Sequence, residues 1–326
     1  MSEVVEIVKN IYRFPIPLPG SPLKELNCYV VKGDHRHLMV DVGFNTPEGH
    51  KAVLKACANL NISLADIDIF LTHLHADHTG LIEELKKECG KIYISEIDAI
   101  QVNRNFEDSY WIESMSIQRH AGFPEAEILD YREHPAYVGG SLTHTDFEYV
   151  TEGMLFSYGG YNFEAIDLRG HSPGQMGLYD KTTGVFFCGD HILNKITPNI
   201  NLWDFETDYL GLFLENLRKV KTMDVKTLLS AHRAPVSNAH ERVDQLIAHH
   251  NKRLANAIDI LAAGKTTVYQ VAMETPWDYG GGLFEKFPAT QKWFAASEIF
   301  AHLEHLRVLG KVNLNIDDKT YHYTVA

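Results

Sequence analysis

The chain has 326 residues, of which 45% are hydrophobic and 22% are charged, which is the composition of an ordinary globular protein. Its 43 acidic residues outnumber its 30 basic residues, and the formal net charge of −13 disfavours a general nucleic-acid binder because such a field repels phosphate backbones. The four cysteines form no CxxC pair, and the first twenty residues hold no continuous apolar stretch. We therefore expect no disulfide scaffold, no signal peptide, no membrane span and a cytoplasmic location.

The first part of the chain alternates strand-like and helix-like segments. Its predicted elements, in chain order, are strands at 27–32 and 37–42, a helix at 47–60, a strand at 67–71, a helix at 81–87 and a strand at 91–95. Pro47 is well placed for the first turn of the first helix. This order indicates a layered α/β architecture with its chemistry on the loops that leave the strands.

Residues 98–140 are helix-compatible, rich in aromatic and polar residues, and free of strand alternation. We interpret them as a helical insertion between two halves of the sheet system. Four apolar side chains there could form a wall for an acyl or aromatic substrate, or simply pack the insertion onto the domain: Phe106, Tyr110, Trp111 and Met115. After the insertion we predict strands at 155–158, 161–166 and 185–188, a helix at 207–220 and a strand at 227–230.

The last part of the chain is helical in pattern from about 240 to 309, and residues 311–325 have the pattern of a hairpin. Helices followed by one terminal hairpin indicate a small winged-helix-like unit with residues 297–306 as its central helix. The sequence thus predicts a catalytic domain at 1–239 and a mostly helical C-terminal domain at 240–326.

A histidine-rich loop follows the predicted strand at 67–71. It places three imidazoles and a carboxylate within six residues, at His73, His75, Asp77 and His78. Imidazole and carboxylate are the ligands that zinc and similar divalent ions prefer. In an extended segment His73 and His75 point to the same side, whereas Asp77 and His78 would leave the first turn of a helix. One loop could therefore serve two ions, but a closed pair needs further ligands.

Three further candidates, His171, Asp190 and His232, lie where such a fold would supply them. Each is the first strong ligand type after an apolar strand-like run. A lone histidine at a strand end is more often a hydrogen-bonded loop residue, but three candidates in order behind an H-x-H-x-D-H motif favour the ligand interpretation.

These signatures resemble the metallo-β-lactamase superfamily. In chain order they are Asp41-Val42-Gly43, the His73–His78 motif, His171, Asp190 and His232, and they span about residues 27–233. The resemblance implies an α/β fold, a four-layer αββα sandwich with the metals at one edge. It also implies two bound divalent metal ions. Zinc is the first candidate, and iron and manganese also fit a set of His and Asp ligands.

The resemblance further implies how the ligands divide. One site would use His73, His75 and His171, and the other would use Asp77, His78 and His232, with Asp190 bridging the two. Asp41 would not bind metal but would order the ligand loops.

Two residues narrow the function within the superfamily. True β-lactamases of this fold commonly have a cysteine where this chain has Asp190, and the flavo-diiron branch typically has a glutamate where it has His75. We therefore expect a hydrolase that directs a hydroxide at the ester, thioester or lactone of a small molecule. Asp77 would both bind metal and orient the nucleophile, and His191 or Tyr209 could protonate the leaving group.

Two alternatives involve nucleic acid. The C-terminal region resembles the winged-helix extension of the lactamase-like protein 2 endoribonucleases, so a ribonuclease or phosphodiesterase is the second hypothesis, although Arg233 stands where that branch usually has glycine. A metal-sensing DNA-binding protein is the third. Residues 240–326 carry nine Lys/Arg and ten Asp/Glu, which disfavours both. That unit could instead cover the active-site edge or a dimer interface, which allows a homodimer.

Overall fold

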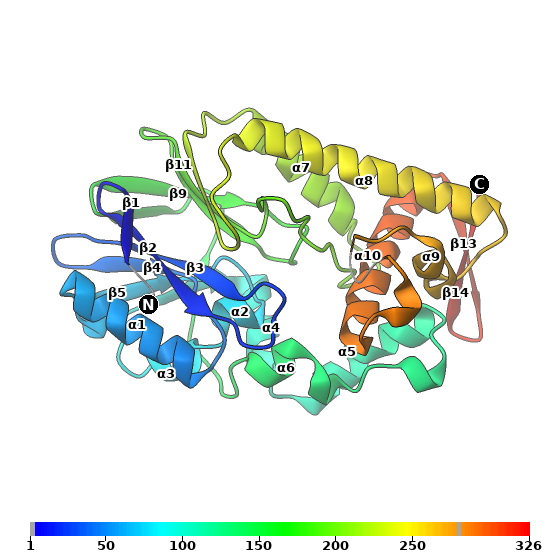
Figure 1. Ribbon diagram of the computed structural model, residues 1–326, viewed down its shortest axis with the longest axis horizontal. Helices are drawn as coiled ribbons and strands as arrows, with labels where there is room; N and C mark the ends of the chain where they lie inside the picture. Colours follow the sequence, from blue (N-terminus) through cyan, green and yellow to red (C-terminus); the bar gives the residue numbers. More distant parts are fainter. Residues whose placement is uncertain (1–3, 279–281) are drawn as a thin grey trace.

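The computed structural model describes residues 4–278 and 282–326. The parts of the expectations above that fall on residues 1–3 and 279–281 lie outside it. Two sheets pack face to face, and helices cover their outer faces (Figure 1). The predicted four-layer αββα sandwich is confirmed.

The first sheet has seven strands in chain order: β1 (Val5–Val8), β2 (Ile11–Pro17), β3 (Glu25–Val31), β4 (His37–Val40), β5 (Ile67–Phe70), β6 (Ile92–Ser95) and β7 (Glu148–Val150). Its first four strands pair antiparallel, and β4 to β7 pair parallel. Because parallel neighbours need a crossover connection, the segments after β4, β5 and β6 are the long ones that carry helices.

The second sheet has five strands in the order β12-β11-β10-β9-β8. They are β8 (Leu155–Tyr158), β9 (Tyr161–Asp167), β10 (Met176–Asp180), β11 (Val185–Gly189) and β12 (Thr227–Ser230). All neighbours pair antiparallel except β11 and β12, which are parallel and are joined through a helix.

Aromatic side chains from both sheets fill the layer between them. The Tyr29 ring of β3 meets the Phe187 ring of β11 edge to face at 5.4 Å, and Phe70 of β5 meets Phe156 of β8 at the same distance. Phe163 of β9 is fully buried in this layer, because alternate residues of β9 point inward. These contacts fix the two sheets relative to each other.

Short helices cover the outer face of the seven-stranded sheet. They are α1 (Pro47–Leu60), α3 (Ile82–Leu85) and α4 (Glu96–Arg104), and their apolar residues share one buried cluster with β5 and β6. The predicted bounds of α1 are those observed. Pro47 occupies its first turn, and the Thr46 hydroxyl accepts a hydrogen bond from the Gly49 N–H at 3.1 Å, so the sequence signals for a helix start are all used.

The insertion contains the end of α4 together with α5 (Asp108–His120) and α6 (Pro135–Gly139). It lies between β6 and β7 of the same sheet, so its predicted position between two halves of the sheet system is wrong by one strand. The reason is that β7 has only three residues, of which Glu148 and Tyr149 are exposed, and such a strand shows no apolar alternation. Short helical segments complete the chain: α2 (Ala76–Thr79) and 3₁₀ turns at Leu64–Asp66, Glu125–Glu127, Tyr131–Glu133 and Phe284–Lys286.

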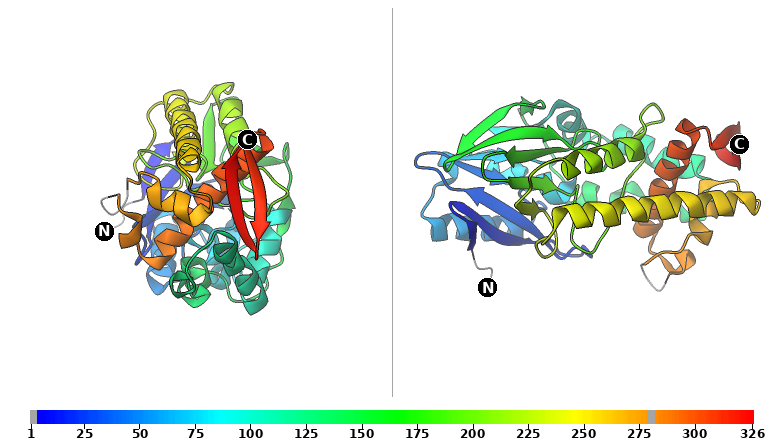
Figure 2. Two further views of the ribbon diagram at one scale, coloured as in Figure 1. Left: turned by 90° about the vertical axis from the view of Figure 1, so that its right-hand side faces the viewer. Right: turned by 90° about the horizontal axis from the view of Figure 1, so that it is seen from above.

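The outer face of the five-stranded sheet is covered by α7 (Tyr209–Lys221) and the long helix α8 (Ala239–Ala262). The chain continues with α9 (Val268–Glu274), α10 (Ala289–Val308) and the hairpin of β13 (Val312–Asp317) and β14 (Thr320–Val325). This is the predicted order of helices and a terminal hairpin. Figure 2 shows α8 running along the molecule from the sheets to this C-terminal group. One buried apolar cluster joins both parts, from Phe186 of β11 through Phe213 of α7 and Leu254 of α8 to Phe300 of α10 and Tyr323 of β14.

In the described part of the chain, no helix combines the length and the apolar composition that crossing a bilayer requires.

Replacing Phe163 by alanine tests the layer between the sheets. The change leaves a cavity where a fully buried ring stood, so we expect Phe163→Ala to lower the free energy of unfolding by about 3–5 kcal/mol. Chemical denaturation measures this change. Leu155→Ala on the adjacent strand is the control, since Leu155 is 67% exposed and should cost little. Equal losses in the two variants would contradict this account of the core.

Candidate metal centre

Four loops that follow strands bring all seven candidate side chains together. The loop after β5 and the first turn of α2 carry His73, His75, Asp77 and His78; His171 follows β9, Asp190 follows β11 and His232 follows β12. Their donor atoms form three overlapping groups in which every atom lies within 4.8 Å of the others: His73, His75 and His171; His73, His78 and Asp190; Asp77, His78 and His232.

The first group has its nitrogens close together. His73 Nε2 lies 2.9 Å from His75 Nδ1, and the rings of His75 and His171 stand edge to face with centroids 4.6 Å apart. The His171 Nδ1–H donates to the backbone carbonyl of Asn199 at 2.6 Å, which leaves Nε2 with a free lone pair. Within the described residues that nitrogen is buried and has no hydrogen-bond partner. Three imidazole nitrogens thus converge: His73 and His75 can share one hydrogen bond, whereas His171 Nε2 is left unpaired.

The third group, Asp77, His78 and His232, contains two opposed imidazoles. His78 Nδ1 is held by the Asp41 carboxylate at 2.8 Å, and His232 Nδ1 is held by the Glu25 carbonyl at 3.0 Å. Both rings therefore turn Nε2 inward, and the two Nε2 atoms lie only 3.3 Å apart. Two lone pairs at this distance in a buried site require a cation between them, whether a proton or a metal. Asp77 Oδ2 is 3.3 Å from His232 Nε2 and completes the group.

Asp190 of the second group lies between the first and the third. Its Oδ2 atom is 3.7 Å from His171 Nε2 of the first group and 3.7 Å from His78 Nε2, which belongs to the third. Its Oδ1 atom is buried and has no hydrogen-bond partner among the described residues. A carboxylate in this place could bridge two cations, and its unsatisfied oxygen fits that role.

The Asp41 carboxylate lies outside the seven-residue cluster and orders the histidine loop. It accepts hydrogen bonds from the Thr72 N–H, the Thr72 hydroxyl and the His78 ring, each at 2.8 Å. The backbone of Asp41 is in the left-handed conformation, with a φ of 58°, and its carboxylate faces Thr72 and His78 of the histidine loop. Such outer hydrogen bonds set the tautomer and direction of a ligating ring.

Burial and mutual charge set the ionisation of the cluster. Burial, together with the neighbouring imidazoles, lowers the pKa of His73 well below its usual value and that of His75 to about 3. Burial alone would raise the pKa of Asp77, but the His78 and His232 rings lower it to about 2. For His78 the effect of burial is outweighed by three carboxylates, led by Asp41, so its pKa rises. The carboxylates are therefore charged and His73, His75 and His171 neutral, which is the state that binds a cation. Asp190 and Asp77 also raise the pKa of His232, so a proton competes with a cation at His78 and His232.

Asp98 is a buried residue of the site that our sequence reasoning missed. Its Oδ2 atom accepts from the Leu74 N–H at 2.9 Å and from the Ser172 hydroxyl at 2.7 Å, so it ties the histidine loop to the loop of His171. Burial raises its pKa to about 7. Its position in the sequence could have identified it. Asp98 comes three residues after the end of β6, and a carboxylate there is expected to lie at the same edge of the sheet as the loop that follows β5.

The two proposed leaving-group donors are placed differently. His191 is fully buried and packs against the Phe213 ring at 4.9 Å, and burial lowers its pKa to about 3. It does not line the groove described next. The Tyr209 hydroxyl does line that groove, but it donates to the Asp204 carboxylate, and burial together with this bond raises its pKa.

A groove of about 1200 Å³ opens onto the cluster, and His75, Asp77, His171 and Asp190 are in its lining. Aromatic side chains from three elements line the rest: Tyr110 and Trp111 of the insertion, Trp203 and Phe205 of the loop before α7, and Trp293 and Phe294 of α10. Of the four insertion residues expected to form such a wall, Tyr110 and Trp111 line the groove. Phe106 is 45% exposed and Met115 is buried, and neither lines it.

Comparison with known proteins agrees with this architecture. A family model described as "Metallo-beta-lactamase superfamily" matches residues 25–232. The chain is 24% identical to the "Probable metallo-hydrolase YqjP" of Bacillus subtilis, over 91% of this chain and 92% of that one. It is also 24% identical to the "Atrochrysone carboxyl ACP thioesterase AacuM" of Aspergillus aculeatus, over 71% of this chain but only 58% of that one.

Solved structures share the fold over the whole chain. The metallo-beta-lactamase family protein TTHA1429 of Thermus thermophilus superposes with a TM-score of 0.82 at 24% identity, covering 98% of this chain and 100% of that one. A beta-lactamase domain protein of Burkholderia ambifaria gives a TM-score of 0.79 at 20% identity, covering 99% of this chain and 95% of that one. Because both cover the C-terminal residues as well, the helices beyond α7 belong to the shared fold.

Gly170, which precedes His171, tests how the loop positions its ligand. A Cβ at Gly170 would lie 2.5 Å from Phe213 Cβ and 2.7 Å from its backbone, and the φ of 137° already disfavours other residues. We expect Gly170→Ala to displace His171 and to lower the metal content of the purified protein, measured by elemental analysis. Gly153→Ala is the control, since Gly153 also has a positive φ, of 84°, but has open space around it. Equal metal content in the two variants would show that the close approach to α7 does not position His171.

Proposed function

Because the chain belongs to the metallo-beta-lactamase superfamily and is a metal-dependent hydrolase, we propose that it binds two divalent metal ions and hydrolyses the ester, thioester or lactone of a small apolar molecule. The observation that carries this proposal is one cavity that joins the His/Asp cluster to an aromatic groove. Zinc is the metal we propose first, and iron and manganese also suit a set of imidazoles and carboxylates.

The cluster suits two divalent ions because, among the described residues, His171 Nε2 and Asp190 Oδ1 are buried without a hydrogen-bond partner, and the Nε2 atoms of His78 and His232 face each other at 3.3 Å. His73, His75 and His171 would hold one ion, and Asp77, His78 and His232 the other, with Asp190 shared. Ions bound there supply a hydroxide near neutral pH and stabilise negative charge on the oxygen of the reacting centre.

Asp77 has a second role in this proposal. Its side chain is 15% exposed and lines the groove, so one carboxylate oxygen faces His232 while the carboxylate also borders the space where a substrate would lie. There it can accept a hydrogen bond from the attacking nucleophile and orient it. The Tyr209 hydroxyl, also in the lining, is the better placed of the two candidate proton donors for the leaving group.

The groove favours an acyl or aryl substrate over a polynucleotide. Among the described residues, its lining contains one Lys or Arg side chain, Arg104, whose guanidinium pairs with Glu107 and Glu113. The lining also contains the carboxylates of Glu133 and Glu206. A phosphodiester backbone needs uncommitted cations along its path. The thioesterase names of several fungal relatives also support acyl chemistry. The ribonuclease and the DNA-binding hypotheses are therefore ranked below the ester hydrolase.

A true β-lactamase activity is also disfavoured. Cys188 lies on β11 in the buried apolar cluster, where its thiol contacts the Ile192 and Leu229 carbonyls, while Asp190 lies in the metal-ligand cluster. Burial also raises the pKa of this thiol. The winged-helix relationship, the boundary at residue 240, the cytoplasmic location and the homodimer stay predictions.

Replacing Asp77 by asparagine tests the catalytic proposal. The amide keeps the shape of the side chain but lacks the negative charge, so we expect Asp77→Asn to lower kcat/KM for acyl esters by about 100-fold or more. Hydrolysis of a panel of ester, thioester and lactone substrates by metal-replete protein measures this. Asp146→Asn is the control, because Asp146 is exposed and remote from the cluster. Wild-type protein that is loaded with metal and inert across the panel would refute the proposal.

Replacing Trp293 by alanine tests the groove. Its ring contacts the His134 ring, with centroids 4.8 Å apart, and forms part of the groove lining. The loss of this apolar surface should raise KM for an aromatic acyl ester by roughly 10-fold and leave kcat unchanged. The matching acetyl ester, which is too short to need the wall, should show no change. Equal effects on both esters would contradict the assignment of the groove to the acyl group.

A further inference from the structure

A hydrogen-bond path connects helix α10 with one of the proposed metal ligands. The Glu298 carboxylate of α10 accepts a hydrogen bond from Asn199 Nδ2 at 2.9 Å. The backbone carbonyl of the same Asn199 accepts the His171 Nδ1–H at 2.6 Å. One residue of the loop between β11 and α7 thus bridges the C-terminal helix and the ligand ring.

The far end of this path is held rigidly. Glu298 is only 6% exposed, and its second oxygen forms an ion pair with the Arg253 guanidinium of α8. That guanidinium also lies over the Trp277 ring, 4.4 Å from its centroid. Both carboxylate oxygens therefore have partners, and the direction of the oxygen that receives Asn199 is determined by two helices.

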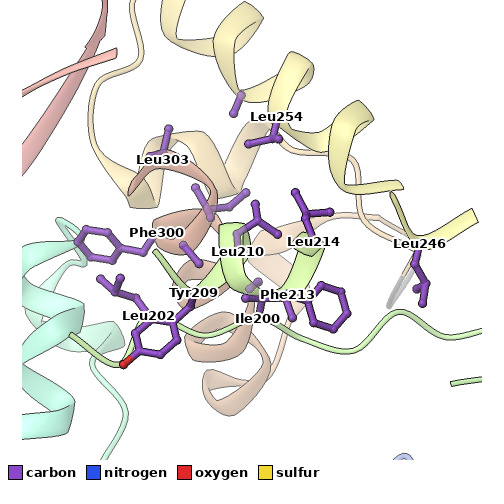
Figure 3. Close-up of a cluster of buried hydrophobic side chains, with 14 of the residues drawn as sticks. Ile200, Leu202, Tyr209, Leu210, Phe213, Leu214, Leu246, Leu254, Phe300 and Leu303 are labelled. Carbon is purple, nitrogen blue, oxygen red and sulfur yellow. The ribbon is translucent and has the colours of Figure 1, made fainter. Parts of the chain in front are cut away.

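The Asn199 segment is also fixed on α10 by its neighbours. Ile200 and Leu202 belong to the apolar cluster that includes residues of α7, α8 and α10, and Leu202 lies beside Phe300 (Figure 3). The Leu202 N–H donates to the Ser297 hydroxyl at 3.2 Å. The position of the Asn199 carbonyl is therefore set by α10 rather than by the sandwich strands alone.

We infer that Asn199 and Glu298 are positioning residues of the metal centre. They hold the carbonyl that keeps His171 protonated on Nδ1 and turns its Nε2 toward the cluster. This inference rests on the proposed function in one respect, that His171 binds metal. It gives the C-terminal helices a role in the active site, because α10 then sets the geometry of a ligand supplied by the loop after β9.

Glu298 also belongs to a second group with metal-type ligands, together with His250 and His302. The contacts there form a hydrogen-bond network instead. His302 Nδ1 donates to the Glu298 carbonyl at 2.7 Å, and His302 Nε2 lies 3.1 Å from His250 Nδ1. The Arg253 cation already neutralises the carboxylate, so a divalent ion at the same oxygen would be repelled.

Asn199→Ala tests the inference, because it removes the side-chain hydrogen bonds to Glu298 and to the Phe294 carbonyl of α10 and keeps the backbone carbonyl. Nitrogen-15 NMR of the imidazoles in metal-free protein reports the tautomer of His171. We expect the pure Nδ1–H form in the wild type and a mixture in the variant. Competition titration with zinc should show an affinity that is about 10–100-fold weaker in the variant. Asn199→Leu, which keeps the volume, should behave in the same way.

Glu304→Gln on the same helix is the matched control. Glu304 is buried and bonded to Tyr323 and Arg307, so its loss should lower stability without changing the His171 tautomer or the zinc affinity. A wild-type tautomer or an unchanged zinc affinity in Asn199→Ala would overturn the inference. The tautomer is read without metal or substrate, so a wild type inert toward esters would remove the proposed function and still leave this result decisive.

Discussion

The structure of this site depends on a constraint on its histidines. Three of its five rings have the outer nitrogen already committed, His78 to Asp41, His171 to Asn199 and His232 to the Glu25 carbonyl. The inward nitrogens then face one another in a buried space, where they cannot all be satisfied by protein groups. The folded cluster is therefore stabilised by positive charge at its centre, and cations that bind there raise the free energy of unfolding.

The part of the site that is local in sequence was predictable. The H-x-H-x-D-H spacing reflects an extended segment followed by a helical turn, and the structure has both, with α2 beginning at Ala76. His171, Asp190 and His232 were found because each follows an apolar run that forms a buried strand. The same rule placed β12, and the helical pattern with Pro47 placed α1, each with the observed bounds. No strand was predicted for β1, β2, β7 or β10; the last, Met176–Asp180, contains a glycine and is too short to show a period.

The remaining features are invisible in the sequence because they arise from contacts between distant segments. Asp98, Asn199 and Glu298 are ordinary polar residues in their local context, in a first helical turn, a loop and a long helix. Their roles depend on partners that lie tens of residues away, such as Ser172 for Asp98 and Arg253 for Glu298. The groove is equally nonlocal, since the insertion, the loop before α7 and α10 each contribute one wall.

The apolar cluster that runs from β11 through α7 and α8 to α10 and β14 has a consequence for cooperativity. A chain divided into autonomous modules melts in separate steps, whereas elements that share one continuous interior lose their structure together. Because the C-terminal helices share this interior with β11 and α7, we expect them to unfold together with the sandwich. Removing them would expose a large apolar surface on α7 and α8, and the truncated chain would be prone to aggregation.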